Sequence, residues 1–123
     1  MAKFLVDEVL DGTLDVLATA TLITVCNAQP TTYTEAATTF KLADVVVDSG
    51  DFTKANGDTN GRKVTVAAQS AVPIDTSGTA THVAYAISGS STLLGATTCT
   101  SQALTSGGTV DIPAHDIEVG DPT

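Results

Sequence analysis

The stretch Asn56-Gly57-Asp58-Thr59-Asn60-Gly61-Arg62-Lys63-Val64-Thr65-Val66-Ala67 decides the fold class. Its second half alternates polar and apolar side chains, which is typical of a strand with one buried face. Its first half is rich in Asn, Asp and Gly, the residues that tolerate positive φ in tight hairpin turns. We therefore expect a hairpin here, within a mainly β protein.

Short segments of β-branched residues, separated by turn residues, recur on both sides of this hairpin. Such spacing predicts an antiparallel sandwich or barrel, because the strands do not alternate with helices as in a parallel sheet. Of these two we expect a β-sandwich, jelly-roll-like, over residues 21–112. Residues 30–37 read as a loop with room for one helical turn. The expected strands are Thr21–Cys26, Phe40–Val47, one that starts at Phe52 and Thr53, Arg62–Ala67, Val72–Ile74, Thr81–Ile87, Thr92–Cys99 and Thr109–Ile112.

A different period marks residues 4–17, where apolar residues recur at spacings of three and four. We expect a short helix there, held by packing rather than by propensity, because Gly12 weakens its middle. Asp7, Asp11 and Asp15 stand four apart and so share another face of this helix. The apolar face, expected to pack against the sandwich or against a neighbouring molecule, comprises Phe4, Val6, Val9, Leu10, Leu14 and Leu17.

The chain of 123 residues is expected to form a single domain, residues 1–123, with an extended C-terminal arm at 113–123 that alternates apolar and acidic residues. Five basic residues against 14 acidic ones give a net charge of −9. Such a chain lacks the basic patch that nucleic-acid backbones attract. No apolar run is long enough to cross a bilayer, and Asp7 and Glu8 interrupt any apolar core of a signal peptide.

The loop Asn56–Gly61 places oxygen side chains at alternate positions before a glycine, which resembles the register of a calcium loop. The twelfth position, where a bidentate Glu is needed, is Ala67. A hairpin turn is therefore the favoured interpretation, with calcium binding as the alternative.

Cys26 and Cys99 stand 73 positions apart without a metal-binding spacing. They are expected to be small buried residues on strands, with a disulfide or a zinc site with His82 and His115 as alternatives. His82 is expected to be structural rather than a catalytic base. Without a nucleophile elbow or a phosphate loop, we expect neither an enzyme nor a cofactor.

The carboxylates of the helix and of the C-terminal segment have two readings. They are either a solvated surface or a surface that docks against a basic face of another protein, where charge steers and registers the contact. The C-terminal alternation could also add a strand to the sheet edge of a partner. The candidate interface residues are Phe4, Asp7, Asp11, Asp15, Asp116, Glu118 and Asp121.

Four segments resemble a family of small tailed-bacteriophage proteins encoded among virion-structure genes. They are Cys26-Asn27-Ala28-Gln29-Pro30-Thr31-Thr32-Tyr33, Gly61-Arg62-Lys63-Val64-Thr65-Val66, Ser77-Gly78-Thr79-Ala80-Thr81-His82 and Ile112-Pro113-Ala114-His115-Asp116-Ile117. Together with the helical start, the resemblance covers nearly the whole chain. It carries over no functional residue.

This resemblance implies a β-sandwich component of the virion, made in the cytoplasm of the host bacterium, that decorates or cements the outside of the head shell. The implied partners are the major capsid protein or other virion proteins, and copies of the chain itself. A tail, baseplate or fibre component, as connector or receptor-binding module, is the alternative within the virion. A hydrolase or metal-dependent binding module is the third hypothesis.

Overall fold

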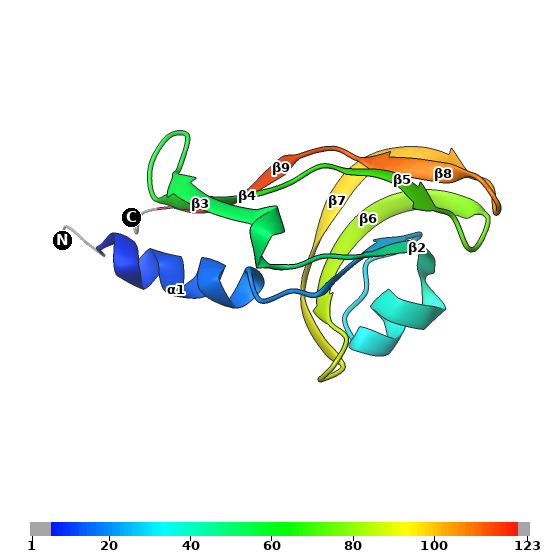
Figure 1. Cartoon of the computed structure of the whole chain (residues 1–123), viewed down its shortest axis with the longest axis horizontal. Helices are drawn as coiled ribbons and strands as arrows, with labels where there is room; N and C mark the ends of the chain where they lie inside the picture. Colours follow the sequence, from blue (N-terminus) through cyan, green and yellow to red (C-terminus); the bar gives the residue numbers. More distant parts are fainter. Residues whose placement is uncertain (1–5, 121–123) are drawn as a thin grey trace.

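The computed structural model describes residues 6–120 and shows a mainly β protein with several antiparallel sheets and one short N-terminal helix. The helix expected over residues 4–17 is α1, Asp7–Leu17. Residues 4 and 5 of that expectation lie outside the described residues. In Figure 1, α1 lies along one end of the molecule beneath β3, β4 and β9, and β6 and β7 curve away at the other end.

The largest sheet has four antiparallel strands in the order β2-β1-β6-β7. They are β1 (Leu22–Cys26), β2 (Lys41–Val46), β6 (Gly78–Ile87) and β7 (Thr92–Leu104). The expected strands at these places are confirmed. β7 runs five residues beyond the expected end at Cys99, because Ala103 and Leu104 pair with Thr79 and Gly78 of β6, which begins three residues before its expected start at Thr81.

A second sheet has the order β3-β4-β9, formed by β3 (Phe52–Asn56), β4 (Arg62–Val66) and β9 (His115–Val119). The expected hairpin is confirmed, since β3 and β4 pair antiparallel around the loop 57–61. Gly61 adopts a φ of +71°, and a Cβ there would lie 2.0 Å from the carbonyl oxygen of Val119. Only glycine fits that position, because a side chain would collide with β9.

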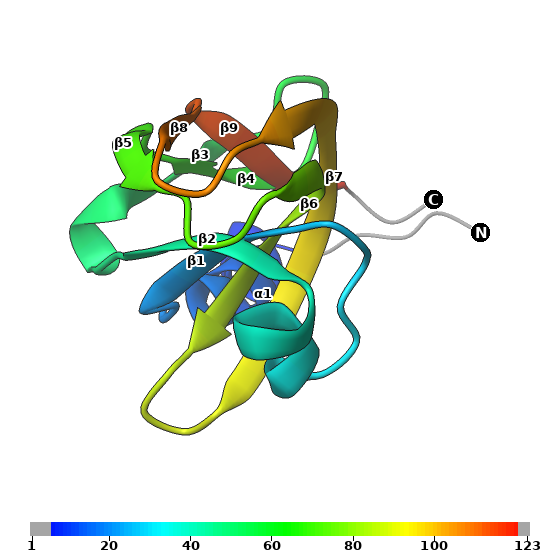
Figure 2. The same cartoon turned by 90° about the vertical axis from the view of Figure 1, so that its right-hand side faces the viewer.

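The third sheet pairs β5 (Gln69–Pro73) with β8 (Thr109–Ile112). Two short helical segments complete the described chain: η1 (Glu35–Thr39), a π-helical turn that begins in the expected loop 30–37 and ends two residues beyond it, and η2 (Ser49–Asp51), a 3₁₀ turn. Figure 2 shows η1 beside the four-stranded sheet. The segment expected as a C-terminal arm, 113–123, contains the edge strand β9, and residues 121–123 lie outside the described residues.

One hydrophobic core joins α1 and all three sheets. It is built mostly from medium aliphatic side chains, with Phe52 and Tyr85 as its aromatic members. The alternation in β4 buries Val64 and Val66 completely, as expected for a strand with one inward face. The described pairings give three separate antiparallel sheets, and the jelly-roll-like connectivity stays a prediction.

Candidate docking surface

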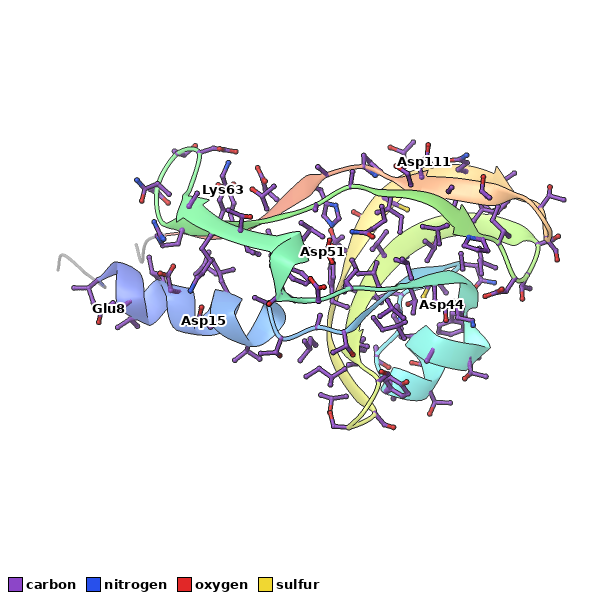
Figure 3. All side chains as sticks on the ribbon, in the orientation of Figure 1. Glu8, Asp15, Asp44, Asp51, Lys63 and Asp111 are labelled. Carbon is purple, nitrogen blue, oxygen red and sulfur yellow. The ribbon has the colours of Figure 1, made fainter. Side chains whose placement is uncertain are left out.

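Helix α1 is held on the β3–β4 hairpin by apolar burial and by two ion pairs. Leu10 and Leu14 are buried, with 3% and 1% of their surface exposed. Beside them the Arg62 Nε atom donates to the Asp11 carboxylate at 2.8 Å, with both side chains 18% exposed. Asp15 pairs with Lys54 of β3. Figure 3 shows Asp15 on α1, below the hairpin.

These pairs give two of the predicted interface carboxylates a partner within the chain. Asp11 and Asp15 share a helix face, as their spacing predicts, and that face meets basic residues of β3 and β4. A half-buried Arg–carboxylate pair fixes the position of a helix better than an exposed Lys pair does. The contact of these residues with another protein stays a prediction. Asp7 begins α1, and its side chain, like the residues Phe4 and Asp121, lies outside the described part.

The opposite flank of α1 exposes valines. Val6, Val9 and Val16 are 47%, 55% and 57% exposed, and we call these three residues the valine face. The expectation that Val6 and Val9 are buried together with the leucines is wrong within this chain. The reason is geometric: at 100° per residue the apolar arc of α1 is wider than the strip that the sheets cover. Among the described residues, Val46 is the remaining exposed large apolar side chain.

A groove of about 650 Å³ adjoins the valine face. Thr13 and Val16 of α1 form one wall, and Leu94–Thr97 of β7 and Asp116–Val119 of β9 form the others. Its surface is mainly apolar, and Tyr85 closes one side. The groove extends the apolar surface of α1 from the helix onto the edges of two strands.

Asp116 and Glu118 of β9 contact the β3–β4 hairpin. The Asp116 carboxylate accepts from the Thr65 hydroxyl at 2.7 Å and from the Lys63 ammonium at 3.1 Å. The hydrogen bond from Thr65, with that from Lys63, lowers the pKa of Asp116 below its ordinary value. Glu118 accepts from the backbone N–H of Asp58 at 2.7 Å. These two carboxylates therefore brace the hairpin and remain exposed at its surface.

Within residues 6–120 every basic side chain is engaged by carboxylates of the same chain. Lys41 pairs with Asp44 and Asp75, and Lys63 pairs with Asp58 and Asp116, in addition to the two pairs on α1. Burial lowers the pKa of Lys41, but its two carboxylate partners outweigh this and raise it. Within the described residues, the Lys and Arg charges are thus balanced by nearby carboxylates, which fits a partner with basic or apolar surface.

Tyr85 and His115 connect the four-stranded sheet to β9. The Tyr85 side chain is 1% exposed, and its hydroxyl bonds to the Nε2 atom of His115. His115 donates from Nδ1 to the Pro113 carbonyl at 2.9 Å, so Nε2 is the acceptor for the tyrosine. Burial raises the pKa of Tyr85. A tyrosine held protonated in this way serves as a structural link between two sheets.

The predicted alternatives for metal and thiol chemistry find little support in the geometry. Cys26 and Cys99 are both free thiols, which excludes the disulfide alternative in this structure, and burial raises the pKa of each. In the turn 56–61, Asn56 accepts from Arg62 and Asp58 pairs with Lys63. No three His, Cys, Asp or Glu side chains of the described residues gather as a metal site would require. No helix among them has the length and apolar character that a membrane crossing requires.

Comparison with known proteins returned no match among family models, curated proteins or solved structures. What the surface can do therefore follows from its residues and their geometry.

Proposed function

We propose that this protein is a non-enzymatic structural component of a tailed-bacteriophage virion, bound to the outside of the head shell as a decoration or cement protein. The resemblance of four segments to small phage virion proteins supports the virion setting. The three sheets and their shared core support a sandwich-like scaffold for it, since they bury both the helix and the strands around one centre.

The observation that carries the docking role is the valine face. Three of the four exposed large apolar side chains of the described residues gather on one flank of α1. Water-exposed apolar surface that gathers in one place is typical of a protein–protein contact. The helix is anchored from its other flank by Leu10, Leu14 and the Asp11–Arg62 pair, so the face is presented rigidly.

The charge distribution supports a shell surface as the partner. With the described basic residues paired internally, the remaining field of the protein is acidic, and it steers the protein toward basic or neutral surface. A small contact repeated over many shell subunits gains strength through avidity rather than through area.

Quantitative mass spectrometry of purified virions, with heads and tails separated, tests this function. We expect the protein in the head fraction at hundreds of copies per particle. A few dozen copies in the tail fraction would support the tail, baseplate or fibre alternative instead. Absence from purified particles would refute the virion role altogether.

A further inference from the structure

The outer edge of β7 is a long, unpaired strand edge. β7 ends the order β2-β1-β6-β7, and nine of its 13 residues pair with β6, on one side only. No turn or loop backbone hydrogen bond of the described residues reaches Thr92–Leu104. Figure 2 shows β7 running along the outer side of the sheet. At roughly 3.3 Å per residue this edge is about 43 Å long.

The opposite edge of the same sheet is protected. β2 carries Lys41 and Asp44, which pair with each other at 3.2 Å. The carbonyl oxygen of Leu42 on β2 accepts from the backbone N–H groups of Asp75 and Thr76, at 2.8 and 3.1 Å. Charge and a covering segment are two of the devices by which proteins prevent edge strands from pairing with other chains.

The remaining edges carry such devices too. β3 has Lys54, and β9 has Asp116 and Glu118. β5 contains Pro73 and an irregular register, and β8 contains Asp111 (labelled in Figure 3). Among the strands of residues 6–120, β7 is therefore the edge strand that lacks charge, proline and cover, although two register shifts interrupt its pairing with β6. A long edge without charge, proline or cover is open to pairing with the strand of another chain.

The composition of β7 indicates what pairs with it. The sequence contains no Asp, Glu, Lys or Arg from residue 76 to residue 110, although the chain as a whole has a net charge of −9. A two-fold contact sets each surface against its own copy, so an acidic patch would meet an acidic patch. Along β7 that repulsion is absent. The exposed Thr98 and Thr100 of one copy would face threonine or other small side chains of the second copy, and threonine pairs stabilise neighbouring strands.

We propose that two copies of the chain pair through the outer edge of β7, antiparallel about a two-fold axis, so that two four-stranded sheets join into one of eight strands. Each β7 supplies the ladder partners that the other lacks, with the contact centred near Thr98, at the end of the stretch 95–98 that pairs regularly with β6. This dimer does not depend on the virion role, because the edge and its neutrality belong to the chain itself.

The test is the oligomeric state of the whole chain and of two variants with the same charge change. Thr98→Lys/Thr100→Lys places lysines on the exposed side of β7. Thr53→Lys/Thr109→Lys places them at exposed positions of β3 and β8, which already carry charge. Sedimentation velocity across a concentration series is expected to show a dimer for the wild type and for the control pair. The β7 pair is expected to weaken dimerisation about tenfold or more, because like charges meet across the axis.

Hydrogen exchange identifies the contact independently of these variants. Amides of residues 92–104 that point away from β6 are expected to gain protection as wild-type concentration rises through the dimerisation range, while those of β2 stay unchanged. A wild-type chain that remains monomeric at millimolar concentration overturns the proposal. A dimer whose strength the β7 lysines leave unchanged, with both variants folded by circular dichroism, also overturns it. Absence of the protein from virions would leave this result untouched, and would refute only the proposed function.

Discussion

Removal of the valine face is the perturbation that follows most directly from the proposed docking role. In the variant Val9→Ser/Val16→Ser, Val6 stays in place, because it is the N-cap of α1 and serine there would strengthen the helix. Full burial of a valine side chain stabilises by about 1.5–3 kcal/mol. Val9 and Val16 have 55% and 57% of their surface left to bury, so each contributes about half of that on docking.

The two valines together thus contribute about 1.5–3 kcal/mol, which corresponds to a loss of affinity of about 10- to 140-fold. The assay measures equilibrium binding of the purified protein to head shells that lack it, with the bound fraction determined by co-sedimentation. Val46→Ser is the control for loss of an exposed valine, since Val46 is 80% exposed and lies on β2 rather than on α1. Valine and serine have similar helix propensities, so thermal unfolding of the free protein is expected to change little. Binding that is equally strong for the double variant and for the control would refute the docking role of α1.

Three further predictions concern how α1 and the hairpin are held. Leu14→Ala, at a side chain 1% exposed, is expected to cost about 2–5 kcal/mol in chemical denaturation, and a cost well below that range would show that α1 is not packed on the core. Arg62→Met breaks the half-buried pair with Asp11 and is expected to lower the free energy of unfolding by about 1–3 kcal/mol. Lys54→Gln, at an exposed pair, is expected to lower it by less. The reverse order would contradict the proposed anchoring. The pKa of Asp116 is lowered in the fold, so its stabilisation is present above its unfolded pKa and is lost as the pH falls through the folded one. Asp116→Asn should therefore reduce the loss of thermal stability between pH 7 and about pH 3, and an unchanged pH dependence would refute this contribution.

Local patterns predict most of the secondary structure. The hairpin at 56–61 and the buried alternation of β4 follow from residue types at adjacent positions, since turn propensity and period-two burial act over a few residues. The end of β7 does not follow from such patterns, because Thr100, Ser101 and Gln102 are polar. Pairing with β6 resumes at Gln102, opposite Ala80, after an irregularity that follows Thr98.

The surface follows less directly from the sequence, since it depends on how distant segments meet. The spacing of Asp11 and Asp15 predicts a shared face, but their partners, Arg62 and Lys54, come from strands some 40–50 positions away. Burial of Val9 could not be judged from the apolar period alone, because the width of the contacting sheets sets how much of the helix arc is covered. The neutral edge of β7 is readable from composition once β7 is known to end its sheet.

The placement of the protein on the particle tests the central claim most directly. In a cryo-EM reconstruction of the head, we expect density for this chain over the outer shell surface, with Val9 and Val16 of α1 turned toward the capsid protein. A head surface without such density, or one on which α1 points into solvent, would contradict the proposed function.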